Sequence, residues 1–201
     1  MRKDVLHSLA VSWTTRLNRY AGKEGADLLK MVLGIEILLH NVPKLALMVT
    51  GAMLLGNLTQ SLAVWLPFAI IRRYASGLHA SNSIKCTVLT MLMFVGVPYV
   101  LWGVLVNEVV LVGAFALIGL GLYRYAPADT EARPIIGKLK RERLKRKAVA
   151  ACVVLLVVSV VLLDMAYYVL VLTGALFAVI AILPLVYRIF RRSVNNYEQF
   201  E

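Results

Sequence analysis

The chain has 201 residues, of which 60% are hydrophobic, and its mean hydropathy is +0.77. Soluble domains are about 45–50% apolar, so this composition excludes an ordinary soluble domain and predicts a membrane protein. The formal net charge is +11, from 22 Lys and Arg residues against 11 Asp and Glu residues. In a membrane protein such an excess is typical of cytosolic loops and of contact with anionic lipid headgroups. We therefore expect those headgroups as partners and no nucleic acid.

Residues 3–20 are predicted to form an amphipathic helix. Apolar side chains from Leu6 to Tyr20 recur at spacings of three and four, which places them on one face. Trp13 and Tyr20 on that face favour the headgroup boundary of a bilayer. The simple function of this helix is membrane anchoring, and recruitment of an amphipathic substrate helix is the alternative.

Long apolar runs follow, and a run of about 18 or more apolar residues can cross a bilayer as a helix. Pro43 is expected to divide the first run, because proline lacks an N–H donor and disfavours helical geometry at the preceding residue. We predict a partly buried helix over 28–40 and about six spans, over 44–55, 58–71, 87–106, 109–123, 148–163 and 166–187.

The positions of Lys and Arg predict how the spans are oriented. Basic residues gather in the two termini and in the loops 72–85 and 124–147, whereas the turns at 56–60, 107–108 and Asp164 contain none. Because positive residues remain on the cytosolic side, both termini and both long loops are expected in the cytosol of a cell-membrane protein.

The predicted fold class is therefore all-α, a polytopic membrane protein with an N-terminal amphipathic helix and a basic cytosolic interfacial helix. We expect a single domain over 1–201. Its soluble-facing parts are the helix at 3–20, the loop at 72–86 and the basic loop at 124–147.

The first long loop holds one histidine and one cysteine, His79 and Cys86, seven residues apart. The thiolate is the reactive form of cysteine, and a neighbouring histidine can take its proton, so the pair is a candidate for nucleophilic catalysis. Spacing alone does not exclude a solvated loop histidine and a cysteine that only packs. Two residues are too few for a structural zinc site, and we predict no metal or other cofactor. The other cysteine, Cys152, falls in an apolar run and is predicted to pack.

Catalysis by this pair requires a bend in the chain. In a straight helix the two residues would lie about 10 Å apart along the axis, beyond the roughly 3 Å of a hydrogen bond. The turn-forming residues 80–83 can supply the bend, and Asn82 or Ser83 is the predicted N-cap of the next helix. Cys86 then falls in the first turn, where the positive helix end and Lys85 favour a thiolate. Unpaired N–H groups there can bind an oxyanion.

Three segments together match a known family pattern in order and spacing. They are RRYASGLH at 72–79 with Cys86, YAPADT at 125–130 with PI at 134–135, and LGIE at 33–36 with Asn41 and Lys44. On these segments nearly the whole chain resembles the accessory gene regulator B family (AgrB). Members of that family are membrane endopeptidases that process the precursor of a cyclic quorum-sensing peptide.

The resemblance implies roles for five residues of the first segment. The catalytic histidine and cysteine of the family correspond to His79 and Cys86. The glycine before the histidine corresponds to Gly77, and the arginine pair corresponds to Arg72 and Arg73, whose charges would add to the positive field around the thiol.

A sixth residue, Glu36, falls where relatives carry Gln or Glu. A group there could orient His79 or steady the oxyanion. Together with Ser83 and Lys85, it completes the set of predicted supporting residues.

The resemblance also implies a two-step acyl transfer. Cys86 attacks a peptide carbonyl and releases the C-terminal tail, and a Cys or Ser side chain of the precursor then attacks the thioester to close a thiolactone or lactone ring. The implied substrate is a small propeptide with an amphipathic N-terminal helix and an acidic tail, which suits a basic cytosolic face. Small enzymes of this kind often pair, so a homodimer is a further expected partner. The alternatives are a peptide exporter and a non-catalytic membrane scaffold.

Overall fold

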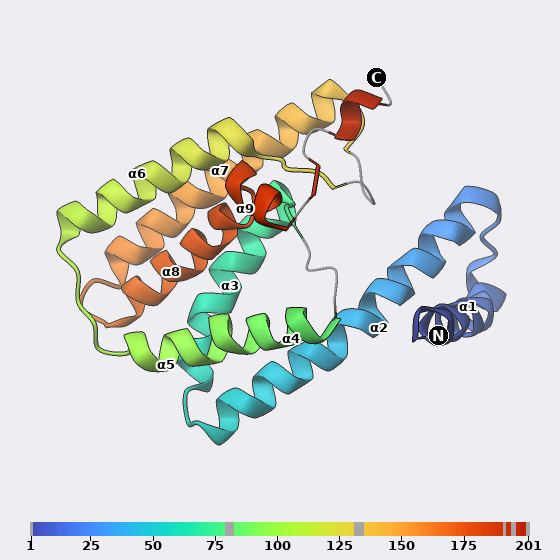
Figure 1. Cartoon of the computed structure of the whole chain (residues 1–201), viewed down its shortest axis with the longest axis horizontal. Coiled ribbons are helices and arrows are strands. Elements are labelled where there is room, and N and C mark those ends of the chain that lie inside the picture. Colours follow the sequence, from blue (N-terminus) through green and yellow to red (C-terminus); the bar gives the residue numbers. More distant parts are fainter. Residues whose placement is uncertain (1, 79–82, 131–134, 191, 194–195, 200–201) are drawn as a thin grey trace. The chain divides into compact units, whose positions relative to one another are not determined.

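The computed structural model describes residues 2–78, 83–130, 135–190, 192–193 and 196–199. Within these residues every regular element is a helix (Figure 1), and the remaining pairing is an isolated parallel bridge between Ser76 and Ala128. The chain divides into two compact units, Met1–Gly51 and Ala52–Glu201.

The first unit holds α1 (Arg2–Ala21) and most of α2 (Gly25–Leu54). The helix predicted over 3–20 is confirmed by α1. The division predicted at Pro43 is wrong, because α2 continues through that residue. A proline removes one backbone hydrogen bond, and an apolar helix tolerates this loss where the surrounding turns remain intact.

The second unit contains the other helices. They are α3 (Leu58–Ala75), α4 (Ser83–Met91), a π-helical turn (Leu92–Gly96), α5 (Val97–Leu101), α6 (Glu108–Tyr125), α7 (Lys138–Val161), α8 (Tyr167–Ile180), α9 (Pro184–Ile189) and a 3-10 turn (Asn196–Gln199).

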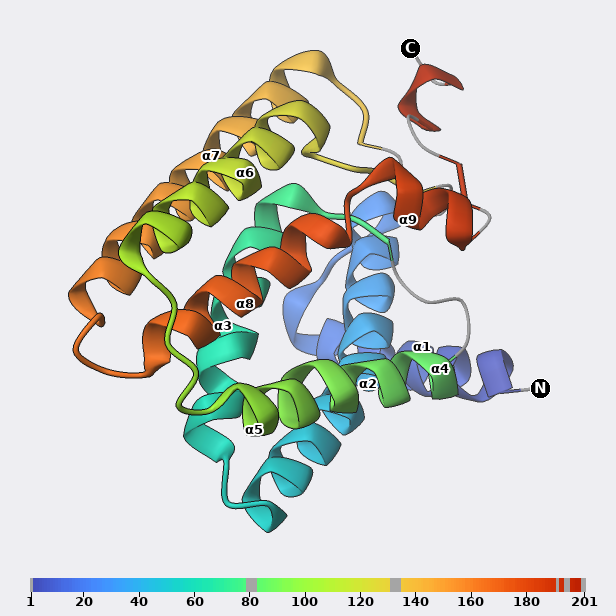
Figure 2. The same cartoon turned by 60° about the vertical axis from the view of Figure 1, so that its left-hand side comes forward.

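Four of these helices surround the core of the second unit. Helix α3 packs against α7 and α8, and α6 packs against the same two helices, so that α6 and α7 lie side by side in both views (Figures 1 and 2). Fully buried apolar side chains such as Ile71 and Leu122 fill the space between them. Helices α3 and α8 approach closely at Gly174 of α8, where a Cβ atom would lie 2.2 Å from the carbonyl oxygen of Val64 in α3.

The π-helical turn joins α4 and α5 to this core. A π turn interrupts the regular i to i−4 bonding, and the Asn57 side chain donates to the Val95 carbonyl at 2.9 Å. Phe94 in the same turn contacts the Phe68 ring edge-on, with centroids 4.9 Å apart. The helix that carries Cys86 is therefore held against α3 through its continuation.

Three helical stretches among the described residues are long and apolar enough to cross a membrane. They are Gly25–Leu54, Ile84–Leu101 and Glu108–Tyr125, and α8 is apolar but shorter. The protein is therefore an all-helical, membrane-type chain. The predicted total of about six spans remains a prediction.

Several predicted boundaries differ from the structure. The span expected over 87–106 begins earlier and ends at Leu101. The basic interfacial helix and the span after it are one continuous helix, α7, because no glycine or proline separates the basic residues from the apolar ones. The span expected over 166–187 is interrupted after α8, since Pro184 holds Leu183 in an extended conformation and begins α9.

Candidate active site

Cys86 is the fourth residue of α4, as the predicted N-terminal placement required. It is a half-buried free thiol, and its carbonyl oxygen accepts a hydrogen bond from the Thr90 hydroxyl at 2.8 Å. His79 and the predicted bend over 80–83 lie outside the described residues, apart from the backbone of Ser83, which begins α4. The distance between the two predicted catalytic side chains is therefore still a prediction.

Arg72, in the last turn of α3, reaches back over the chain that leads to His79. Its Nη2 donates to the carbonyl oxygens of Gly77, at 3.3 Å, and of Leu78. Its guanidinium lies 5.5 Å from the centre of the Phe68 ring. Two carbonyls and an aromatic face therefore fix this guanidinium at the point where α3 ends and the loop begins.

The environment of Arg72 is unusual for an arginine. Its Nη1 is buried and has no hydrogen-bond partner among the described residues. Burial lowers the pKa of the Arg72 guanidinium, and the negative charges that Tyr187 and Cys86 can carry act in the opposite direction. A buried donor without a partner is costly. Arg72 therefore presents an unused donor within electrostatic range of the Cys86 thiol.

Gly77 occupies a position that other residues cannot readily take. Its φ angle is +110°, and a Cβ atom there would lie 2.9 Å from Arg72 Nη1 and from the Ala181 carbonyl oxygen. Its N–H donates to the Ala128 carbonyl at 2.9 Å, and the next N–H, of Leu78, donates to Ala181 at 3.1 Å. A glycine is required because the backbone here passes close to two neighbouring segments.

The segment YAPADT at 125–130 is the neighbour on one side. The N–H of Ala128 donates to the Ala75 carbonyl at 2.9 Å, which completes the bridge to the end of α3. The structure thus brings together the first two of the three segments that carry the family resemblance. The third, which contains Glu36, lies in the first unit.

Sequence reasoning missed the residues that hold this junction. Asp129 is buried, and its carboxylate accepts from the backbone N–H groups of Asn196, at 3.0 Å, and Tyr197, at 2.9 Å. The Tyr187 hydroxyl donates to the Asp129 carbonyl at 2.9 Å, and burial raises the pKa of Tyr187 to about 12, so this donor stays protonated at neutral pH. Asp129 lies within the segment YAPADT at 125–130, but its partners Tyr187, Asn196 and Tyr197 are distant in sequence, and no pattern in the sequence indicates these contacts.

The remaining predicted residues have different surroundings. Arg73 and Lys85 are exposed, and the side chain of Ser83 lies outside the described part of the chain. Glu36, in α2, pairs with His7 of α1, with 3.5 Å between Oε2 and Nδ1. This contact joins the two helices of the first unit.

Comparisons with known proteins identify relatives along most of the chain. The family model for accessory gene regulator B matches residues 10–182. An AgrB-like protein from Clostridium acetobutylicum is 34% identical over 200 residues, which cover 100% of this chain and 96% of the relative. An AgrB-like protein from Listeria monocytogenes serotype 4a is 40% identical over 173 residues, with 86% and 85% covered.

A more distant relative is the accessory gene regulator protein B of Staphylococcus aureus strain MW2. It is 31% identical over 132 residues, which cover 65% of this chain and 70% of the relative. No solved structure matches the chain. The extent of the family match and the identity to full-length relatives lead to one conclusion: the chain belongs to the accessory gene regulator B family.

Proposed function

We propose that this protein is a membrane-embedded cysteine endopeptidase that removes the C-terminal tail of a small signalling-peptide precursor. Cys86 is the nucleophile and His79 its general base. Family membership supports a role in peptide-based regulation. The precursor as substrate follows from the family resemblance.

The observation that carries the proposal is the position of Arg72. Its buried Nη1 lacks a partner among the described residues, Cys86 lies within its electrostatic range, and its other amino group binds the backbone directly before His79. A preorganised cation in a site of low polarity stabilises negative charge that develops during a reaction. Arg72 is thus suited to neutralise charge on the sulfur or on a tetrahedral oxyanion.

The proposed reaction has two steps. His79 takes the proton from the Cys86 thiol, and the sulfur attacks the scissile carbonyl. The C–N bond breaks, and the tail leaves as an amine that receives the proton from His79. A Cys or Ser side chain of the precursor then attacks the thioester, which closes a ring and returns the proton to Cys86. Because thioester and thiolactone are similar in energy, loss of the tail would drive the sequence forward.

The proposed topology has six spans, with both termini and the loop that leads from α3 to Cys86 in the cytosol. The apolar helices that would form the spans lie within α2, α3 up to Ile71, α4 with α5, α6, α7 and α8. The basic ends of α3, α6 and α7 then face the cytosol. A homodimer remains part of the proposal and rests on the resemblance alone.

The two cysteines permit a matched test. The protein is co-expressed with a candidate precursor, a small propeptide with an amphipathic N-terminal helix and an acidic tail, and tail release is followed by mass spectrometry. We expect Cys86→Ala and His79→Ala to abolish release, whereas Cys152→Ala retains it because Cys152 is packed in α7 against α6. An intact Cys86 should also yield an adduct that hydroxylamine releases. Cleavage by the Cys86→Ala variant would show that the mechanism is wrong.

A further inference from the structure

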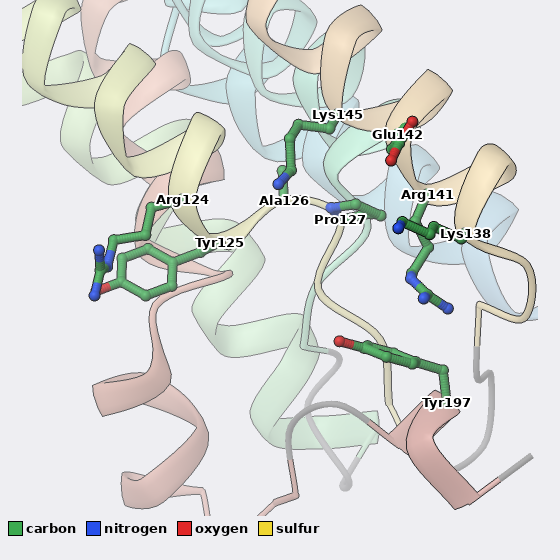
Figure 3. A pocket seen from close by; sticks show the side chains of 9 residues that line it. All are labelled: Arg124, Tyr125, Ala126, Pro127, Lys138, Arg141, Glu142, Lys145 and Tyr197. Atoms are coloured by element: carbon green, nitrogen blue, oxygen red, sulfur yellow. The ribbon is translucent and has the colours of Figure 1, made fainter. Parts of the chain in front are cut away.

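A cavity of about 260 Å³ lies between the end of α6, the first half of α7 and the C-terminal 3-10 turn (Figure 3). It is separate from the Cys86 loop in sequence, and the proposed chemistry does not use it. Its lining carries four cations and one carboxylate, which are Arg124, Lys138, Arg141, Lys145 and Glu142.

Among the described residues, no acidic side chain forms an ion pair with Arg124, Lys138 or Lys145. Two of them rest on aromatic rings instead. Arg124 lies 5.8 Å from the centre of the Tyr125 ring, and Lys145 Nζ lies 5.5 Å from that of Tyr123. Four cations against one carboxylate leave an excess of positive charge in the lining, so this cavity favours an anion.

Arg141 and Tyr197 form one wall of the cavity, and contacts with the protein hold both residues in place. The Arg141 guanidinium lies 3.7 Å from the centre of the Tyr197 ring, and its Nη1 donates to the Ile135 carbonyl at 3.3 Å. Figure 3 shows the Arg141 side chain extended toward Tyr197. The Tyr197 backbone is itself held by Asp129. Arg141 is therefore oriented before any ligand arrives, which reduces the entropic cost of binding.

The position of the cavity indicates the source of the anion. It lies at the polar end of α6, a helix long and apolar enough to span a membrane, and beside the positive N-terminal end of α7. Apolar side chains next to it are exposed: Tyr123 by 65%, Leu120 by 62% and Leu139 by 81%. Cations and tyrosines directly beyond an apolar helix are placed at the level of lipid phosphates.

We propose that this cavity, the α6–α7 basic pocket, binds the headgroup phosphate of an anionic phospholipid. Lys138, Arg124 and Lys145 supply the positive charge, and the Arg141 guanidinium, held against the Tyr197 ring, adds to it. The Tyr125 and Tyr197 rings form the amphipathic walls between headgroup and acyl chains. The proposal concerns lipid binding and does not depend on peptidase activity.

The test measures binding of dioctanoyl phosphatidylglycerol to the full chain in neutral detergent, by titration and by the rise in Tm. The pocket variant is Arg124→Gln with Lys145→Gln. Its matched control is Arg143→Gln with Arg146→Gln, which removes the same charge from exposed positions of α7 outside the lining. Each basic residue near the membrane surface contributes about 1 kcal/mol, so we expect the pocket variant to bind at least tenfold more weakly and the control to bind nearly as wild type.

Three further ligands identify what the pocket recognises. Dioctanoyl phosphatidylcholine should bind far more weakly, and neither sodium phosphate nor a hexaglutamate peptide should displace the anionic lipid at equal concentration. An equal loss of lipid affinity in both double variants would overturn the proposal, because it would show that the lipid is attracted by the overall positive charge of the surface and not by the pocket. Displacement by phosphate would identify a soluble anion site, and displacement by the acidic peptide would identify a peptide site. Each of these results would contradict a lipid pocket. None of them bears on the proposed peptidase activity, which tail release tests separately.

Discussion

At the scale of single residues, Gly77 determines how the loop leaves α3. Its φ angle of +110° and the 2.9 Å separation between a Cβ atom and the Ala181 carbonyl leave no room for a side chain. We expect Gly77→Ala to cost about 1–3 kcal/mol of local stability and to reduce tail release strongly. The measurements are the cleavage rate and thermal unfolding in detergent. Gly113→Ala is the control, because nothing lies within 4 Å of a Cβ there, and wild-type behaviour of Gly77→Ala would refute the assigned constraint.

Arg72 is the second residue whose chemistry can be isolated. Arg72→Lys keeps the charge but removes the planar guanidinium, whose Nη2 donates to Gly77 and Leu78 and whose Nη1 is the buried donor without a described partner. We expect tail release to fall on the order of 10²-fold, as for loss of an oxyanion donor. The neighbouring exposed Arg73→Lys should behave as wild type. Similar losses in the two variants would indicate that only the overall positive charge matters.

At the scale of elements, the contact between α3 and α8 depends on Gly174. Close approach of two helices requires a small residue at the crossing point, and a Cβ at Gly174 would lie 2.2 Å from the Val64 carbonyl oxygen. Gly174→Ala should therefore force the helices apart and destabilise the protein by about 1–3 kcal/mol. A lowered Tm in detergent is the expected result. An unchanged Tm would show that α3 and α8 can separate without loss.

The C-terminal segment is held to the end of α6 by one carboxylate. Asp129 accepts hydrogen bonds from Asn196 and Tyr197, and bonds to a charged group contribute about 1.5–3 kcal/mol each. We expect Asp129→Ala to release this segment, so that trypsin cleaves after the exposed Arg192 at least several times faster. Asp164→Ala, in an exposed turn, should leave the cleavage rate unchanged. Equal digestion of the two variants would argue against the anchor.

At the scale of the whole molecule, the positions of the basic residues predict which ends of the helices face the cytosol. In a chain that lacks both native cysteines, a cysteine at Lys140 should react with an impermeant maleimide only after the cells are opened. A cysteine at Asp164, in the turn between α7 and α8, should react in intact cells. The reverse pattern would invert the proposed topology, and reaction of both in intact cells would show that α7 does not cross the membrane.

Much of the fold could be predicted because it rests on local properties of the chain. Helix α6 was predicted to within two residues, since a continuous apolar run between Glu108 and Arg124 leaves little alternative. Pro43 and Pro184 show the limit of such reasoning. One lies within a continuous helix and the other separates two helices, because the effect of a lost hydrogen bond depends on what packs around it.

The sequence by itself determined that this is a helical membrane-type chain, that its basic residues are segregated, and that Cys86 lies in the first turn of a helix. These are consequences of composition, periodicity and short-range capping. Only the tertiary structure decided that Gly77 lies against Ala128, that four cations line the α6–α7 basic pocket, and that Arg72 keeps a buried donor with no partner in the described part of the chain. Such contacts join residues far apart in the chain, and their energies depend on burial and direction, which no local pattern contains.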